Sequence, residues 1–289
     1  MKQIVNSISV FGLGLIGGSL SLAIKSKYPK IKIFGVDQNH EHANTALELN
    51  IVDEVKSAHD EDVLQSDLII LAIPVSAINE ILPQLLSNVF SKTVVIDAGS
   101  TKSSICKTIN LHENRSNFVA AHPIAGTEYS GPEAAFPNLF KGKKNIICEF
   151  ELCNERAQKC ARWLFKSVGM DNIFMDAESH DKHLAYVSHL SHISSFMLGL
   201  TVLNIEKDEE NILNLAGSGF ESTVRLAKSS PDMWAPIFQQ NKIHLSKALN
   251  EYINQLQQFQ KHLEAGNEVE LKVSMHKANE IKKVLRKLL

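Results

Sequence analysis

The chain has 289 residues, 44% of them hydrophobic, and its 30 basic and 32 acidic residues give a formal net charge of −2. This length is enough for one large domain or two ordinary ones, and the balanced charge gives no indication of nucleic-acid binding. No uncharged apolar run reaches the ~20 residues of a membrane span, the N-terminus does not resemble a secretory signal, and four cysteines without a C-x-x-C pair predict a reducing, cytoplasmic environment.

Short apolar runs alternate with helical patterns over the first 176 residues. The run DLIILAI at residues 67–73 is apolar almost throughout, as expected for a strand buried on both faces of a parallel sheet. Strands are predicted at residues 7–11, 32–36, 67–73, 93–96 and 118–121, and helices at residues 15–25, 41–49 and 77–86. This alternation predicts βαβ units and a Rossmann-type, doubly wound α/β sheet.

Strand-like runs disappear after about residue 176. Helical periodicity is found at residues 179–203, 209–215, 220–227, 234–259 and 268–288. We therefore predict an α/β domain at residues 1–176 and an all-helical domain at residues 177–289. The predicted helices are rich in Leu and Ile, which favours a bundle or an oligomer interface, and we expect a homodimer formed through this region.

A glycine-rich turn follows the first predicted strand. Gly12, Gly14 and Gly17 form G-x-G-x-x-G, in which the glycines permit a tight turn, the approach of a pyrophosphate, and helix–strand packing. The N-terminus of the following helix adds partial positive charge. Asp37 ends the second strand, where a carboxylate accepts hydrogen bonds from ribose hydroxyls and repels a 2′-phosphate. The pattern predicts NAD rather than NADP as cofactor, the alternative being glycines that serve only the turn.

Two further loops follow predicted strands and so lie at the edge where a doubly wound sheet binds its ligand. Ile73 and Pro74 end the third strand, and we expect them to form a wall on the nicotinamide side or simply to stop the strand. Ser100 and Thr101, in the sequence DAGSTKSS, come after the fourth strand. Their hydroxyls are candidates for the active site, or for the N-cap of the next helix.

The segment HPIAGTEYSG at residues 122–131 has no regular helical or strand pattern. The strand before it ends at Ala121 and brings His122 to the same edge of the sheet. A neutral imidazole titrates near physiological pH and accepts the proton of an alcohol that is being oxidised. This position predicts a general base for a nicotinamide enzyme; the alternative is a structural histidine in a proline–glycine turn.

Several histidines cluster in the helical region. His189 and His192 lie at i, i+3, with His180 and His183 nearby, a spacing compatible with zinc. No cysteine or carboxylate completes a clear ligand set, and hydride transfer to NAD requires no metal. We therefore predict no metal site and interpret His189 as a packed core histidine.

Five segments together resemble the successive motifs of the prephenate dehydrogenase family, to which the arogenate dehydrogenases are closely related. In chain order they are FGLGLIGGS, DAGSTKSS, HPIAGTEYSG, VSHLSH and GFESTVRLAKSSPDMW. The resemblance implies a Rossmann domain followed by a helical dimerisation domain, the use of NAD, and a place in tyrosine biosynthesis.

The resemblance also implies roles for individual residues. His122 matches the catalytic histidine at the ring hydroxyl, and Ser100 matches a serine that orients it. Arg225 matches a substrate-binding arginine, the alternative being a solvated helix face, and its planar fork suits a carboxylate. The remaining implied contacts are His192, Glu128, Thr127 and Ser218 with the substrate, and Leu15 and Ile16, beside the glycines, with the cofactor. Ser218 stands where relatives often carry glycine.

These observations predict an NAD-dependent enzyme that oxidatively decarboxylates prephenate, a small-molecule substrate, to 4-hydroxyphenylpyruvate. Three alternatives stay open: an arogenate dehydrogenase that gives tyrosine directly, another Rossmann-plus-helical dehydrogenase acting on 3-hydroxyacids or imino acids, and a non-catalytic NAD-sensing protein. Neither nucleic acid nor a membrane is an expected partner.

Overall fold

The computed structural model describes residues 2–206 and 212–285. The chain forms two compact units, Met1–Asn241 and Lys242–Leu289, each of which is described by itself. The predicted boundary at residue 176 lies inside the first unit, at the N-cap of a helix, and stays a prediction. None of the described helices is both long and apolar enough to cross a bilayer.

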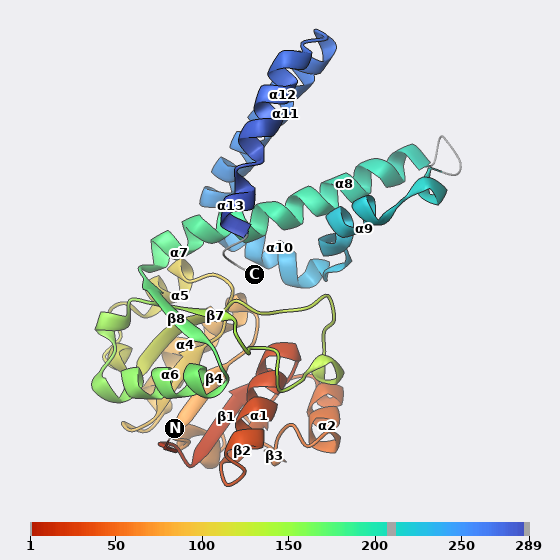
Figure 1. Ribbon diagram of the computed structural model, residues 1–289. Helices are drawn as coiled ribbons and strands as arrows, with labels where there is room; N and C mark the ends of the chain where they lie inside the picture. Colours follow the sequence, from red (N-terminus) through yellow and green to blue (C-terminus); the bar gives the residue numbers. More distant parts are fainter. Residues whose placement is uncertain (1, 207–211, 286–289) are drawn as a thin grey trace. The chain divides into compact units, whose positions relative to one another are not determined.

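The first unit contains an eight-stranded sheet with the order β3-β2-β1-β4-β5-β6-β7-β8 (Figure 1). The strands are β1 (Ser7–Phe11), β2 (Lys32–Val36), β3 (Glu54–Val55), β4 (Leu68–Leu71), β5 (Val94–Asp97), β6 (Phe118–Pro123), β7 (Lys144–Cys148) and β8 (Asp171–Met175). The first six are parallel in the order 3-2-1-4-5-6, which is typical of dinucleotide-binding sheets. The order reverses between β1 and β4, so the switch point lies at their carboxyl ends.

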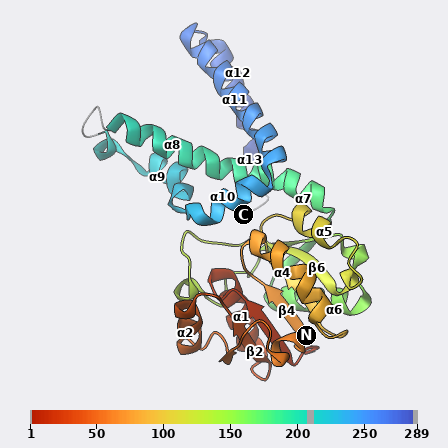
Figure 2. The same ribbon diagram turned by 180° about the vertical axis from the view of Figure 1, so that it is seen from behind.

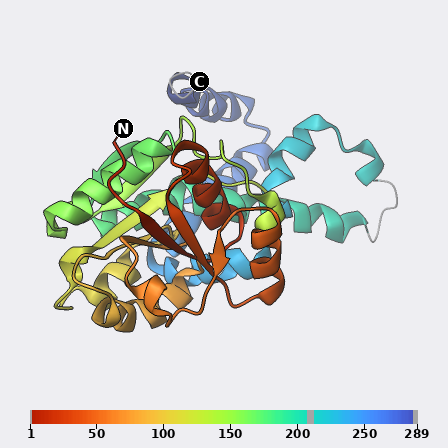
Figure 3. The same cartoon turned by 90° about the horizontal axis from the view of Figure 1, so that it is seen from below.

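Helices cover both faces of this sheet. One apolar core joins α1 (Leu15–Lys27), α2 (His40–Glu48) and α6 (Glu155–Ser167) to one face, and a second core joins α4 (Val75–Asn88), α5 (Ser103–Ile109) and α7 (Ala177–Leu184) to the other. The short helix α3 (Glu61–Leu64) precedes β4. Figure 2 shows α4 and α5 from behind, and Figure 3 shows the strands between the two layers. The predicted doubly wound fold is confirmed.

The strand β6 extends further than the sequence indicates. It was expected to end at Ala121, but His122 and Pro123 also pair with the antiparallel strand β7, opposite Ile146 and Asn145. The sequence pattern does not indicate β7, so His122 and Pro123 have no strand partner among the predicted elements. His122 is therefore anchored at the end of a strand rather than carried on a loop.

The region after residue 176 is all-helical among the described residues, as predicted, but its helices are shorter than expected. Asn241 separates α10 from α11, and Asn279 and Glu280 separate α12 from α13. A π-helical turn interrupts the predicted helix at residues 179–203, and parts of two predictions, 209–211 and 286–288, lie outside the described residues. The elements are η4 (Ala185–His189), α8 (Leu190–Glu206), η5 (Leu213–Leu215), α9 (Ser218–Val224), η6 (Arg225–Lys228), α10 (Pro231–Gln240), α11 (Lys242–Glu264), α12 (Glu268–Ala278) and α13 (Ile281–Leu285).

Candidate active site

The glycine-rich loop lies at the switch point, between β1 and α1. Gly12 has φ +86°, and a Cβ there would lie 2.4 Å from the carbonyl oxygen of Ala72. A Cβ on Gly17 would lie 1.9 Å from the carbonyl oxygen of Gly12, so backbone packing alone requires both glycines. The space beside Gly14 is open up to the amide of Gly131, 4.0 Å away. The first turn of α1 has no acidic residue, so its N-terminus suits an anion such as a pyrophosphate.

Asp37 follows β2 and is tied to this loop. Its carboxylate accepts hydrogen bonds from the backbone amides of Leu13, at 2.8 Å, and Asn39, at 2.9 Å. Each carboxylate oxygen accepts more than one hydrogen bond, so acceptor capacity is left for ribose hydroxyls. The loop and the acid are thus fixed relative to each other, as a bound dinucleotide requires.

The other residues predicted to contact the cofactor border the same loop. The Ile73 side chain lies 2.9 Å from where a Cβ on Gly12 would be, and Pro74 is the N-cap residue of α4. Leu15 and Ile16, in the first turn of α1, are partly buried against the apolar core. Each of these residues has a structural role here, and its contact with a cofactor stays a prediction.

A buried ion pair fixes the backbone that leads to His122. The Lys102 ammonium binds the Asp97 carboxylate, and both side chains are fully buried. Lys102 Nζ also donates to the carbonyl of Ala121 at 2.8 Å, while Asp97 accepts the Ala121 amide at 3.0 Å. The pairing of β5 with β6 ends at Asp97 and Ala120. The two side chains therefore continue the hydrogen bonding of the sheet beyond its last backbone pair.

His122 belongs to a chain of hydrogen-bonded side chains that the sequence analysis missed. His122 Nδ1 lies 2.9 Å from His180 Nε2, and His180 Nδ1 lies 2.8 Å from Asp181 Oδ1. Asp181 also accepts the amides of Lys102 and Ser103, at 2.8 and 2.9 Å. His180 and Asp181 come from α7, so this helix brings a second histidine and a carboxylate to the end of β6.

This arrangement decides one open question about Ser100 and Thr101. Neither caps α5, because the N-cap residue of that helix is Lys102 and no side chain caps it. The Asp181 carboxylate accepts the amides of Lys102 and Ser103. Thr101 instead donates to the side chain of Gln240 at 2.7 Å. Ser100 is partly exposed and follows β5, at the same edge of the sheet as His122. Its catalytic role stays a prediction, and the N-cap interpretation is wrong for both residues.

The histidines at this edge have lowered pKa values. Burial, with the nearby His180, Lys102 and His189, holds the pKa of His122 well below its usual range. Burial also lowers the pKa of His180, against the effect of Asp181, and lowers that of His189 to about 4. Burial opposes ionisation of Asp181, but the bonds from His180 and the two amides lower its pKa overall. At neutral pH we therefore expect neutral imidazoles beside an ionised Asp181.

His192 and Arg225 lie on neighbouring elements. The His192 ring stacks on Trp234 with centroids 3.5 Å apart. Ser195, one turn further along α8, donates to the carbonyl of Thr223 at 3.0 Å and accepts the amide of Ala227 at 3.1 Å. These bonds fix the turn that carries the exposed Arg225. Burial and the Arg225 charge lower the pKa of His192, so a cation and a neutral imidazole are placed near each other.

Hydrogen bonds and ring contacts connect this pair to the side chains around His122. The His189 ring is edge-on to Trp234, with centroids 5.9 Å apart. The side-chain nitrogen Nδ2 of Asn241 lies 3.1 Å from His189 Nδ1 and also donates to the backbone carbonyl of Asp181. The structure thus assembles His122, His180, His189, His192 and Arg225 along one strip of the first unit. No group of three or more His, Cys, Asp or Glu side chains within residues 2–206 and 212–285 is arranged to bind a metal.

The remaining predicted contacts lie on exposed segments. Thr127 and Glu128 belong to the strap, the segment of residues 124–131 that joins β6 to the short helix η2 (Pro132–Ala134). Since η2 contacts both α1 and α2, the strap crosses the carboxyl edge of the sheet towards the glycine-rich loop (Figure 1). Ser218 is the first residue of α9. Their contacts with substrate stay predictions.

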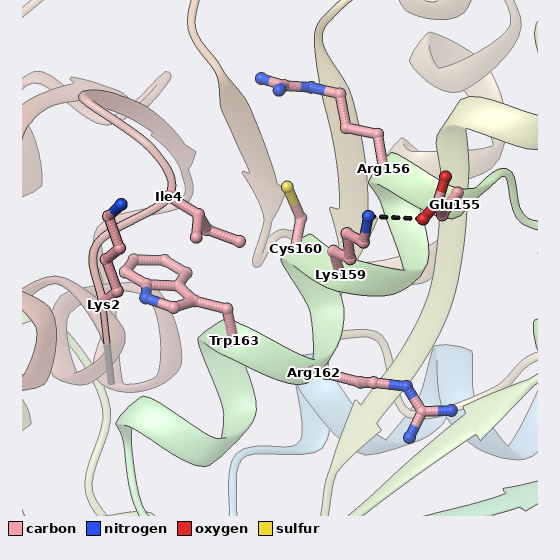
Figure 4. A pocket seen from close by; sticks show the side chains of 8 residues that line it. All are labelled: Lys2, Ile4, Glu155, Arg156, Lys159, Cys160, Arg162 and Trp163. Carbon is pink, nitrogen blue, oxygen red and sulfur yellow. Dashed lines mark hydrogen bonds and ion pairs between the residues drawn. The ribbon is translucent and has the colours of Figure 1, made fainter.

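One pocket lies away from these residues. It has a volume of about 490 Å³ and lies at the amino edge of the sheet, between the N-terminal segment and α6 (Figure 4). Its lining residues are Lys2, Ile4, Glu155, Arg156, Lys159, Cys160, Arg162 and Trp163. None of the residues predicted to act in catalysis or binding lines it.

Comparisons with known proteins agree with this geometry. A family model described as "Prephenate dehydrogenase, nucleotide-binding domain" matches residues 20–173, and one described as "Prephenate dehydrogenase, dimerization domain" matches residues 176–277. The chain belongs to the prephenate dehydrogenase family. Members of this family are oxidoreductases, and the chain has the nucleotide-binding and the dimerization domain of the family. The alternative of a 3-hydroxyacid or imino-acid dehydrogenase is wrong.

Three relatives illustrate the range of the family. A crystal structure of prephenate dehydrogenase from Aquifex aeolicus, in complex with hydroxyphenyl propionate and NAD+, has a TM-score of 0.87 and 31% identity and covers 98% of this chain and 99% of that one. Prephenate dehydrogenase of Bacillus subtilis is 30% identical over 91% of this chain and 72% of its own length. Arogenate dehydrogenase of Synechocystis has a TM-score of 0.78 and 26% identity, with 96% and 99% covered.

Proposed function

We propose that this protein is an NAD-dependent prephenate dehydrogenase. The observation that carries the proposal is His122, fixed at the carboxyl end of β6 by a buried ion pair and a second histidine. Family membership and the Aquifex structure with NAD+ and hydroxyphenyl propionate support prephenate and this cofactor. The acid at Asp37, bound to the glycine-rich loop, supports NAD over NADP.

The chain's residues have separate tasks in this reaction. NAD, held by the glycine-rich loop and Asp37, would supply the hydride acceptor for the ring carbon that bears the hydroxyl. His122 accepts the hydroxyl proton as that carbon becomes a carbonyl, and its lowered pKa keeps the ring neutral and ready to accept. The carbonyl withdraws electrons as the ring carboxylate leaves as CO2, and the ring becomes aromatic. The proton on His122 then returns to the oxygen, which gives a phenol.

Positioning the two carboxylates of prephenate requires cationic or hydrogen-bonding groups away from the base. Arg225 offers a planar, permanently charged fork on a turn that Ser195 fixes to α8. The strap adds Thr127 and Glu128, and we propose that Glu128 pairs with Arg225 when the site is closed. Ser100 completes the arrangement as the residue that orients His122 and the nicotinamide.

Arogenate is a second candidate substrate, and one observation favours it. His192 Nδ1 lies 3.0 Å from the carbonyl oxygen of Ser188, which only accepts hydrogen bonds. Nδ1 therefore carries the hydrogen, and in the neutral ring Nε2 has a lone pair. A lone pair suits the ammonium group of arogenate better than the keto oxygen of prephenate. The greater similarity to the Aquifex enzyme favours prephenate, so the two substrates must be compared directly.

We also propose a homodimer in the cytosol. The dimerization model matches residues 176–277, and α8 and α11, each in its own unit, expose apolar side chains. The exposed residues include Met197, Leu200, Leu203 and Ile205 on α8 and Ile253, Leu256, Phe259 and Leu263 on α11. The four cysteines are free and buried, as a reducing compartment permits. Light scattering at micromolar concentration tests the dimer, and a monomer would contradict it.

One assay tests the catalytic proposal. The purified protein is mixed with NAD and either prephenate or arogenate, and NADH formation is followed by its near-ultraviolet absorbance. We expect a larger kcat/KM with prephenate. A preference for arogenate would support the alternative based on His192, and no turnover with either substrate would support the non-catalytic NAD-binding alternative.

A further inference from the structure

We infer that His180 and Asp181 are positioning residues that fix the tautomer of His122, so that Nε2 is the nitrogen that accepts the substrate proton. This inference deepens the proposed function and rests on it. It concerns two residues on α7 that do not belong to the predicted catalytic or substrate-binding set.

The direction of each hydrogen bond follows from the acceptor at the end of the chain. An ionised carboxylate has no hydrogen to donate. Asp181 Oδ1 must therefore accept from His180 Nδ1, at 2.8 Å. A neutral imidazole carries one hydrogen, so His180 Nε2 has a lone pair. That lone pair faces His122 Nδ1 at 2.9 Å and must accept a hydrogen from it. His122 is then protonated at Nδ1, and its own lone pair is on Nε2.

The surroundings of Asp181 fix the direction of the hydrogen bonds from His122 to His180 and from His180 to Asp181. The carboxylate also accepts the amides of Lys102 and Ser103, which begin α5. Both amides are permanent donors, and neither oxygen can change role without leaving a buried donor unpaired. The backbone of α5 therefore dictates the ionisation of Asp181, and through it the tautomers of both histidines.

The same chain stabilises the charge that forms during the reaction. When His122 Nε2 accepts the substrate proton, the ring becomes a cation with both nitrogens protonated. Its Nδ1–H remains bonded to His180, which is held by a carboxylate one residue away. A base oriented by a second group, which is itself oriented by a carboxylate, follows the general logic of catalytic triads. In this protein the carboxylate of Asp181 does not bond to the base directly, because the His180 imidazole lies between Asp181 and His122.

The first test measures the tautomer directly and needs neither substrate nor cofactor. Nitrogen-15 spectra of histidine-labelled protein at neutral pH, with His122 assigned through His122→Asn, distinguish a protonated from an unprotonated ring nitrogen. We expect Nδ1 of His122 to be protonated and Nε2 not. The opposite tautomer in the unmodified protein would overturn the inference, whatever the enzyme's activity.

The second test uses kinetics. His180→Phe keeps an aromatic ring but removes the acceptor, and we expect kcat to fall by about 10–100-fold while KM changes less than about threefold. His180→Gln keeps a side-chain acceptor and should recover part of the loss. His183→Gln, on the exposed histidine of the same helix, is the matched control and should leave both constants unchanged.

A structural role alone would give a different result. If His180→Phe keeps near-normal kcat with a changed His122 spectrum, the tautomer has no catalytic importance and the inference fails. If that variant does not fold, Asp181→Asn and the spectrum of the unmodified protein still decide. Absence of turnover in the unmodified protein would refute the proposed function, while the spectrum would still show whether the relay exists.

Discussion

The two edges of the sheet differ in how their charged groups are used. At the carboxyl edge, side chains from β5, β6, α5 and α7 converge on His122, and a buried ion pair fixes the backbone beside it. At the amino edge, a pocket is lined by several cations, two of which form ion pairs with neighbouring carboxylates. Arg156 binds Asp67, Lys159 binds Glu155, and Arg156 and Arg162 point apart (Figure 4).

This difference shows what makes a concave surface into a candidate site. The charged side chains that line the pocket do not converge on one point: Arg156 pairs with Asp67, Lys159 pairs with Glu155, and Arg162 lies over aromatic rings. The carboxyl edge has titratable groups whose pKa values are shifted by burial and by one another. Shifted pKa values combined with convergent geometry indicate function better than pocket size does.

The largest effect is expected at His122. His122→Asn removes the base but keeps a small polar side chain at the end of β6, and we expect kcat to fall by 10²–10⁴-fold, roughly 3–5 kcal/mol of barrier. KM should change much less, because the carboxylates are bound elsewhere. Steady-state kinetics measure both, and a near-normal kcat would mean that His122 is structural.

The pH dependence of the unmodified enzyme tests the same residue. Only the neutral ring accepts a proton, and burial lowers the pKa of His122. The acid limb of kcat/KM, which reports the free enzyme, should therefore lie below the usual histidine value of about 6.5. An acid limb at or above that value would show that another group controls the reaction.

Stability should also depend on pH because of this edge. Burial lowers the pKa of folded His189 to about 4, whereas the unfolded chain binds a proton at about 6.5. The unfolded state thus binds more protons below that value, and stability falls as the pH falls. Between pH 7 and pH 5 we expect His189 to account for about 2 kcal/mol of lost unfolding free energy. Urea denaturation at both pH values should show a smaller loss for His189→Gln; an unchanged loss would contradict this assignment.

Much of the carboxyl edge was predictable from the sequence, because the spacing of apolar residues and glycines indicates the strands and the loops that follow them. Apolar runs and glycines identified β1, β2, β4 and the cofactor loop, because their signals are local. Lys102 and Asp97 could not be identified as a pair, since their partner Ala121 lies on another strand. His180 and Asp181 lie in a stretch whose pattern indicates only a helix. Their contact with His122 could not be predicted, because His122 and His180 are 58 residues apart in the sequence. The boundaries of β6 and of the helix that ends at Gln240 depended on tertiary contacts in the same way.

A smaller effect is expected on the substrate side. Arg225→Ala removes a charged fork that binds a carboxylate equally in the ground and transition states, so KM should rise about 10–100-fold with kcat nearly unchanged. Lys228→Ala, an exposed cation on the same 3₁₀ turn, is the control and should change KM little. A fall in kcat without a rise in KM would place Arg225 in the chemical step instead.

The preference for NAD over NADP should depend on Asp37, with an effect similar to or smaller than that of Arg225→Ala on KM. With Asp37 at the ribose, NAD should be preferred over NADP by at least about tenfold in kcat/KM, or ~1.4 kcal/mol. Asp37→Ser keeps a hydroxyl near the loop but removes the negative charge, so the preference should narrow. Equal use of both cofactors by the unmodified protein would refute the assignment of Asp37.

The smallest effect is expected at the amino edge. The Arg162 guanidinium lies over the rings of Phe150 and Phe174, at 4.9 and 5.2 Å from their centroids. Cation–π contacts at exposed sites contribute about 0.5–1 kcal/mol each, so Arg162→Ala should lower the unfolding free energy by about 1 kcal/mol. Because the pocket lies at the edge opposite His122, kcat and KM should stay unchanged.

The control for this variant is Lys159→Ala, which removes only an exposed i, i+4 pair with Glu155 on the same helix. Such exposed pairs contribute little to stability, so the loss of unfolding free energy should be smaller than for Arg162→Ala. Urea denaturation and steady-state kinetics on the same preparations separate the two properties. If Arg162→Ala instead changes kcat or KM while the control does not, the amino edge communicates with the active site, and the contrast between the two edges fails.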